Sequence, residues 1–175
     1  TPMKVRNTLL AAAVALVAGV SFQASAAETS STFQVTATVA SSCAIMGADE
    51  LSFGVYDAVV VNKAEDKKSS SKFQVRCNGG TTATIRLDEG MYKSAASQCS
   101  FPVRQMFDGG EGKLTYYLSK TYNYQDSFGC DAESEATVTF ANLETQDINV
   151  YGRIQAGQNA PVGIYSDTVT VQVLF

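Results

Sequence analysis

The sequence contains no histidine, and histidine is the commonest proton-transfer residue of enzymes. Triads that pair a serine or cysteine nucleophile with histidine are therefore excluded. The cysteines show no Cys-x-x-Cys spacing, so no typical zinc site is expected. The glycine pairs at Gly79 and Gly109 lack the lysine and the serine or threonine of a phosphate-binding loop. We expect no metal, no cofactor and no enzyme.

Positive charge is also scarce, with 13 Lys and Arg against 17 Asp and Glu and a net charge of -4. Nucleic acids and anionic lipids attract proteins chiefly through an excess of Lys and Arg. Neither is expected as a partner.

Long apolar stretches are lacking as well, because the longest, Leu9 to Val20, is about a dozen residues where a spanning helix needs roughly twenty. This stretch follows Lys4 and Arg6 and precedes Ala24-Ser25-Ala26, which is the layout of a secretory signal peptide. We expect residues 1–26 to be a signal peptide with an upstream remnant, and no membrane insertion.

Four cysteines follow the leader, and export from the cytosol favours disulfides. Four cysteines permit three pairings, of which sequence order favours Cys43 with Cys77 and Cys99 with Cys130. Each loop would hold about thirty residues, so each bridge would stabilise the fold by about 3 to 4 kcal/mol in the chain-entropy model.

Nearly every apolar cluster after the leader alternates with period two, which places alternate side chains on opposite faces of a sheet. Turn signals such as Asn78-Gly79-Gly80 and Asp108-Gly109-Gly110 separate these runs. We expect a solvated loop at 62–72 and a long loop, held by the second disulfide, at 90–108. The pattern predicts a single all-β sandwich or barrel. The predicted strands are 33–39, 51–55, 73–77, 83–87, 114–118, 136–140, 148–154 and 169–175.

Two groups of polar residues are weaker candidates for a site. The acid pairs Asp88 with Glu89 and Asp131 with Glu133 could divide acid and base roles, but they lie beside turn signals and more simply face solvent. Tyrosines gather in the middle of the chain and could stack against a carbohydrate, although aromatics in sheets are more often packing residues. These tyrosines are Tyr116, Tyr117, Tyr122 and Tyr124.

Long alternating runs lie near both ends of the mature chain. An exposed apolar edge strand is an aggregation hazard, so something must cover these runs. Periodicity alone leaves two explanations open, pairing of both runs inside one closed sandwich or pairing between molecules. The apolar residues are Phe33, Val35, Ala37 and Val39 in the first run, and Val169, Val171, Val173 and Phe175 in the last.

Several short motifs follow one another along the mature chain. They are an alternating run ending at Cys43, then Leu51-x-Phe53-Gly54-x-Tyr56-Asp57, Val75-x-Cys77, Arg104-x-Met106, Leu114-x-Tyr116-x-Leu118, Val150-x-Gly152-x-Ile154, and Pro161-x-Gly163-x-Tyr165-x-Asp167-x-Val169-x-Val171-x-Val173-x-Phe175. This order resembles the spore coat protein U domain family, which includes subunits of archaic chaperone-usher pili. The resemblance covers essentially the whole mature chain, and the terminal motif is its most specific part.

The resemblance implies an immunoglobulin-like β-sandwich that lacks its last strand and so leaves an apolar groove. A periplasmic chaperone would fill the groove first, pairing with the edge strand that holds Tyr165, Val169, Val171, Val173 and Phe175. At an outer-membrane usher, the N-terminal strand of the next subunit would replace the chaperone's strand. That donor strand would be residues 27–41, with Phe33, Val35, Ala37 and Val39 entering the groove of the pilin-like domain at 42–175.

We therefore expect a structural pilus subunit, exported through the periplasm to a cell-surface fibre or secreted, that supports adhesion or biofilm formation. Its partners would be a chaperone, an usher, and further copies or other pilus subunits. A shaft or adaptor position fits a single domain better than a tip adhesin does. The alternative is a stand-alone secreted sandwich that binds a carbohydrate or protein ligand through its tyrosines.

Overall fold

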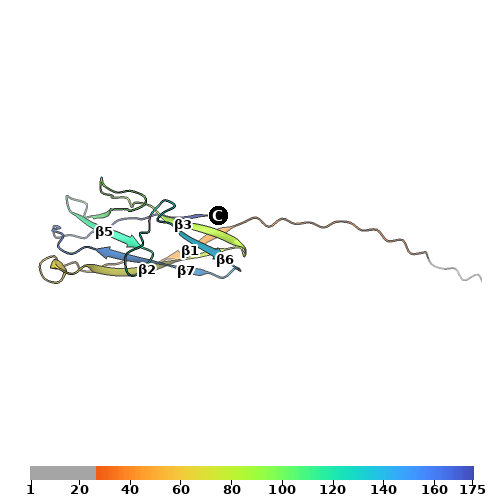
Figure 1. Cartoon of the computed structure of the whole chain (residues 1–175), viewed down its shortest axis with the longest axis horizontal. Helices are drawn as coiled ribbons and strands as arrows, with labels where there is room; N and C mark the ends of the chain where they lie inside the picture. Colours follow the sequence, from red (N-terminus) through yellow and green to blue (C-terminus); the bar gives the residue numbers. More distant parts are fainter. Residues whose placement is uncertain (1–26) are drawn as a thin grey trace, which may run out of the picture. The chain divides into compact units, whose positions relative to one another are not determined.

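The computed structural model describes residues 27–175, and the expected signal peptide lies outside the described residues. Residues 27–42 form no strand or helix, and all strands belong to the unit Val39–Phe175 (Figure 1). Within the described range no helix is long and apolar enough to cross a membrane. The elements are β1 (Cys43–Ala48), the 3-10 helix η1 (Val61–Lys63), β2 (Lys67–Cys77), β3 (Thr81–Leu87), β4 (Arg104–Phe107), β5 (Lys113–Ser119), β6 (Ala136–Phe140), β7 (Gln146–Ile154) and β8 (Val171–Leu174).

The strands form two antiparallel sheets. One sheet has five strands in the order β1-β2-β7-β5-β4, and the other has three in the order β6-β3-β8. Alternate residues along the strands face inward and make the core. Examples are Phe73 and Val75 of β2 and Ile85 and Leu87 of β3, all of which are buried. The period-two pattern therefore predicted the all-β class and, for strands such as β2 and β3, the side that faces the core.

The longest ladder joins β2 to β7, from Lys67 paired with Ile154 to Val75 paired with Gln146. This ladder corrects the prediction of a solvated loop at 62–72, because residues 67–72 belong to β2. The serines suggested a loop exposed to water, but they belong to a strand. Ser69 and Ser71 donate their hydroxyls to the carbonyls of Ser52 and Asp49. A strand at this place uses serine to hold the neighbouring loop.

The stretch 51–55 was predicted to be a strand, and this prediction is wrong, since it has no regular secondary structure. Leu51 and Phe53 nevertheless pack against the core. Gly152 of β7 makes room for them, because a Cβ there would lie 2.7 Å from the Phe53 ring and 2.8 Å from Leu51. Their alternation reflects contact with the sheet rather than membership in it.

The stretch 90–108 is only partly the long loop that was expected. It ends in β4, which pairs with β5 from Arg104 opposite Tyr116 to Phe107 opposite Lys113. The loop before β4 holds Cys99, bonded to Cys130. The four-residue strand was missed because its apolar residues are too few to show a period.

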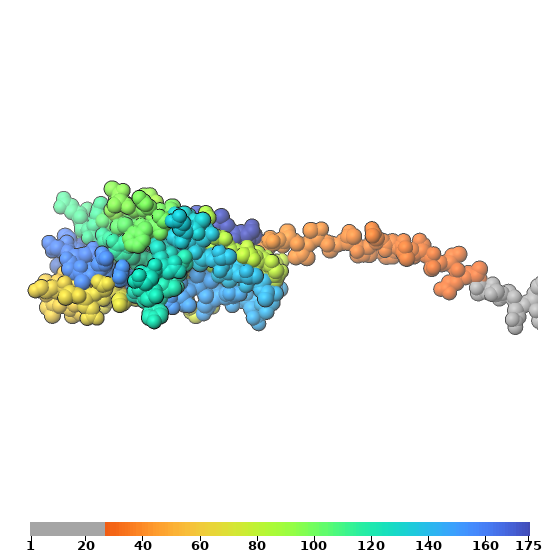
Figure 2. Space-filling model, viewed as in Figure 1, coloured from red at the N-terminus to blue at the C-terminus, as the bar shows by residue number. Residues whose placement is uncertain are grey.

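At one end of the sandwich, the loops near residues 55–65 and 155–165 lie side by side (Figure 2). The hydroxyl of Tyr56 donates to the Gln155 carbonyl at 2.9 Å, and the Gly157 N–H donates to the Asn62 carbonyl at 2.8 Å. These bonds join the two loops at this end of the sandwich, and the C-terminal segment follows the second of them.

Candidate functional site

A cavity of about 380 Å³ opens between the two sheets. One wall is the chain from Ala48 to Leu51, which follows β1, and the other is the C-terminal segment from Tyr165 to Val171. Apolar side chains from several strands line its floor. They include Phe73, Leu87, Met106, Leu118 and Val150.

The two walls continue from strands at the edges of their sheets, since the first follows the end of β1 and the second leads into β8. Within residues 27–175, β1 pairs only with β2, and β8 pairs only with β3. The side of each edge strand that carries no ladder presents main-chain N–H and C=O groups that an added strand can bond. The cavity is therefore a groove with an apolar floor and strand edges beside it.

The C-terminal segment alternates strictly along the groove. The side chains of Tyr165, Val169, Val171 and Val173 are half-buried, while Ser166, Thr168, Thr170 and Gln172 are exposed. The structure thus brings the residues expected to form the acceptor edge to this place, although β8 itself covers only Val171–Leu174. Phe175 is 59% exposed and follows the strand.

Asp167 is the one charged residue among these inward positions, and its carboxylate ties the segment to the rest of the domain. The hydroxyl of Tyr116 donates to Asp167 Oδ2 at 2.6 Å. Asp167 Oδ1 accepts the backbone N–H groups of Met91 at 2.9 Å and Tyr92 at 3.2 Å. Burial raises the pKa of the Tyr116 hydroxyl well above its ordinary value, and the bond to Asp167 adds to this shift.

A second anchor lies behind the groove at Arg104, whose side chain is fully buried. Its guanidinium donates to the carbonyls of Asp88 at 2.9 Å, Phe128 at 2.9 Å and Leu87 at 3.2 Å. Burial lowers the pKa of Arg104 to about 10. The carboxylate of Asp88 in turn accepts the Thr170 N–H at 2.9 Å. Arg104 and Asp88 therefore fix the start of the strand that borders the groove.

The residues expected to act as a donor strand are accessible. Phe33, Val35 and Val39 are 86%, 82% and 81% exposed, and Ala37 is exposed as well. The 33–39 run forms no strand, in contrast to the sequence prediction. A strand needs a neighbour to satisfy its main chain, and these residues make no ladder within the described chain.

The two disulfides join Cys43 to Cys77 and Cys99 to Cys130, which is the pairing that sequence order favoured. The first links paired residues of β1 and β2, at a Cα–Cα distance of 4.1 Å. It fixes the edge strand β1, which leads into one wall of the groove, to the neighbouring strand β2.

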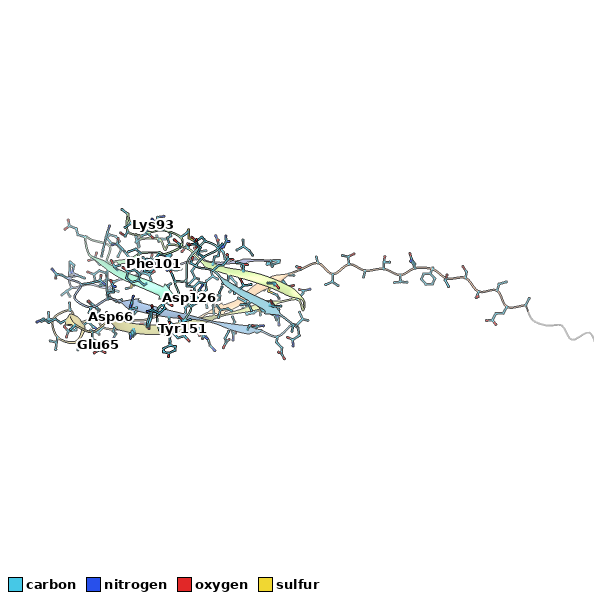
Figure 3. The ribbon with its side chains drawn as sticks, in the orientation of Figure 1. Glu65, Asp66, Lys93, Phe101, Asp126 and Tyr151 are labelled. Carbon is cyan, nitrogen blue, oxygen red and sulfur yellow. A yellow bond between two sulfur atoms is a disulfide. The ribbon has the colours of Figure 1, made fainter. Side chains whose placement is uncertain are left out.

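The tyrosines of the middle stretch do not form one face. Tyr116 points into the groove, whereas Tyr117 lies beside Arg153 and against Phe101, with ring centroids 5.5 Å apart (Figure 3 labels Phe101). Tyr124 also lies beside Arg153, and Tyr122 is 77% exposed. The four tyrosines therefore do not share one surface, although Tyr117 and Tyr124 both lie beside Arg153.

In each candidate acid pair, one carboxylate accepts backbone N–H groups. Asp88 accepts the N–H of Gly90, and Glu89 forms an ion pair with Lys93. Asp131 accepts the N–H groups of Glu133 and Ser134. Asp88, Glu89 and Asp131 are half-buried and only Glu133 is exposed, so the expectation that these acids simply face solvent holds for Glu133 alone.

Sequence reasoning assigned no role to Arg104, Asp167 or Asp88 in building the groove. A signal was available for Asp167, because a single acid interrupts an otherwise apolar alternation and would be costly to bury without partners. No comparable signal marks Arg104, whose partners are all main-chain carbonyls.

Comparison with known proteins decides the family. The model of the Spore Coat Protein U domain matches residues 29–172. The chain belongs to the Spore Coat Protein U domain family. A curated relative, Protein U of Myxococcus xanthus, is 33% identical over an alignment of 180 positions that covers 99% of this chain and 100% of the relative.

A solved structure extends the comparison. It is the chaperone–tip adhesion subunit pre-assembly complex from archaic chaperone-usher Csu pili of Acinetobacter baumannii. The matched chain is 26% identical with a TM-score of 0.55, and the match covers 79% of this Spore Coat Protein U domain chain and 40% of that chain. The resemblance seen in the sequence is confirmed, as are the immunoglobulin-like sandwich and a structural, non-enzymatic protein.

Proposed function

We propose that this protein is a subunit of a chaperone-usher surface pilus and polymerises by donating its N-terminal strand to the groove of a neighbouring subunit. The observation that carries the proposal is the apolar groove between the chain that follows the edge strand β1 and the segment that leads into the edge strand β8. The chain also offers a segment of matching pattern, with alternate apolar side chains exposed at Phe33, Val35 and Val39.

Strand addition supplies main-chain hydrogen bonds along both edges, while alternate side chains enter the groove. Burying a Phe or Val side chain stabilises such a joint by about 1.5 to 3 kcal/mol each, and the small Ala37 contributes less. The residues 27–41 are the donor segment in this proposal, and 42–175 the acceptor domain. The contact joins one face of a subunit to a different face of the next, so it does not close and it builds a fibre.

An unfilled apolar groove is an aggregation hazard, which gives a physical reason for a chaperone before assembly. We infer that a periplasmic chaperone covers the groove along Val169, Val171 and Val173 and that an outer-membrane usher exchanges its strand for the next subunit's. The similar Csu structure is a complex of a chaperone with a pilus subunit before assembly, which supports this order. The finished fibre would act at the cell surface in adhesion or biofilm formation.

The decisive experiment removes residues 27–41 and leaves the domain intact. We expect the full mature chain to form a ladder on SDS gels of unboiled periplasmic extract, which boiling collapses to one band. The truncated chain should run as a single species by gel and by size-exclusion chromatography, because its groove remains but its donor is gone. A full mature chain that stays monomeric, like the truncated one, would refute the proposal and favour a closed binding module.

A further inference from the structure

The residues between Val39 and Cys43 are held against the turn that joins β2 to β3. The N–H of Asn78 donates to the Ser42 carbonyl at 3.0 Å, and its side-chain Nδ2 donates to the Ala40 carbonyl at 3.4 Å. The first bond continues the β1–β2 ladder one residue beyond the Cys43–Cys77 pair.

The bond from the Asn78 side chain to the Ala40 carbonyl lies where the backbone leaves β2 and enters the turn to β3. The N–H of Thr81 donates to the Asn78 carbonyl at 3.1 Å, and Gly80 has φ +85°. A positive φ at this position is typical of a type II turn and favours glycine. β2 ends at Cys77, and the side-chain amide of Asn78 supplies the donor for the Ala40 carbonyl.

This anchor matters because the chain has a competing way to fill the groove. A three-residue linker is long enough for a β-hairpin loop. Residues 33–39 could then fold back along β1, place their apolar face in the groove of their own domain, and leave nothing to donate. The linker Ala40-Ser41-Ser42 contains no Gly, Asn or Asp, the residues that such tight loops favour.

We propose that Asn78 is a positioning residue that keeps the linker 40–42 extended in line with β1 and so prevents the donor segment from closing its own groove. A hairpin at 40–42 requires the Ala40 carbonyl to leave the Asn78 amide. The segment that is denied its own groove is available to a second copy of this chain. This inference rests on the proposed function and adds a residue that directs the strand outward.

The test compares Asn78→Ala with Asn142→Ala in the full mature chain. Asn142 lies in the neighbouring turn between β6 and β7, where its side chain accepts the Glu144 N–H at 2.9 Å, and Asn78 rather than Asn142 bonds the linker. Two properties of the monomer are measured at low concentration. They are hydrogen exchange of residues 33–39 and the binding of a fluorescent peptide of residues 32–40.

Loss of one neutral hydrogen bond should raise the ratio of closed to open monomer by about 2- to 10-fold. Asn78→Ala should therefore slow exchange at 33–39, weaken peptide binding by a similar factor and reduce polymer. Asn142→Ala should behave like the wild type. The double change Ser41→Asn with Ser42→Gly gives the linker a turn-forming sequence and should shift the ratio in the same direction, without touching the buried core.

The failures are distinguishable. If the wild type binds the peptide and polymerises but Asn78→Ala and the linker variant do so equally well, the role of Asn78 is wrong and strand donation stands. An equal effect of Asn142→Ala would also overturn it, because the effect would then be general destabilisation. If the wild type neither binds the peptide nor polymerises, the proposed function itself fails.

Discussion

Val35 and Thr36 are neighbours in the proposed donor segment, and neighbours in an extended strand point to opposite faces. Val35 is 82% exposed in the described chain and would be buried in the groove of the next subunit. We expect Val35→Asp to abolish polymerisation, and Thr36→Asp, which adds the same charge to the outward face, to leave most of it intact.

Two free-energy costs weaken the joint between subunits in Val35→Asp. The joint loses the burial of a valine, about 2 kcal/mol, and must bury a carboxylate without a partner, about 3 kcal/mol or more after relaxation. A total of about 5 kcal/mol weakens the joint by between 10³ and 10⁴, since about 1.4 kcal/mol is a factor of ten. At position 36 neither cost applies, because the outward face stays in water.

The penalty depends on pH with a definite sign. Burial in the groove would raise the pKa of the introduced carboxyl above its ordinary value of about 3.9, because the neutral form is easier to bury. The charged form therefore opposes assembly at pH 7, and assembly should recover as the pH falls through the raised pKa toward 4. Thr36→Asp should show no such recovery.

The assay is the polymer ladder of unboiled periplasmic extract at pH 7 and at pH 4.5, with size-exclusion chromatography of the same samples. The amount of each variant in the periplasmic extract is compared first, so that a loss of polymer is not mistaken for a loss of subunit. Equal loss of polymer in the two variants, or none in either, would refute the assignment of the 33–39 face to the groove.

Two further predictions concern the frame of the groove. Arg104→Met should lower the free energy of unfolding by about 3 to 5 kcal/mol in urea denaturation, because the carbonyls of Leu87, Asp88 and Phe128 lose a charged donor. A loss below about 1 kcal/mol would contradict this role. Replacing Cys43 and Cys77 together by Ala removes a bridge between residues 34 apart and should lower the free energy of unfolding by about 4 kcal/mol, and an unchanged urea midpoint would contradict the estimate.

Much of the fold was predictable because alternate side chains of β2, β3, β5 and β7 are buried. The run 136–140 coincides with β6, and the runs 73–77, 83–87 and 114–118 lie within β2, β3 and β5. The predictions failed where a neighbour rather than the local pattern decides. Residues 67–72 are a polar half of β2 because β7 pairs with them, and residues 51–53 leave the sheet because they pack over Gly152.

The candidate site divides in the same way. The alternation at 169–175 predicted that Val169, Val171 and Val173 face inward, since period two is a local property of extended chain, but it failed at Phe175, which is 59% exposed. It did not reveal the anchors of the C-terminal segment, because the partners of Asp167 are distant in sequence, at Tyr116, Met91 and Tyr92. Long-range hydrogen bonds leave no periodic trace.

The sequence by itself determined an all-β chain, with apolar alternation in the run at 33–39 and in the C-terminal run, because these follow from residue type and period. Only the tertiary structure decided that the chain after β1 and the segment before β8 border one groove, since that depends on how two sheets stack. It also decided that Asn78 meets Ala40, 38 residues earlier in the chain. The apolar alternation of a strand is a local property of the sequence, whereas the groove that can accept a strand forms only when the two sheets pack together.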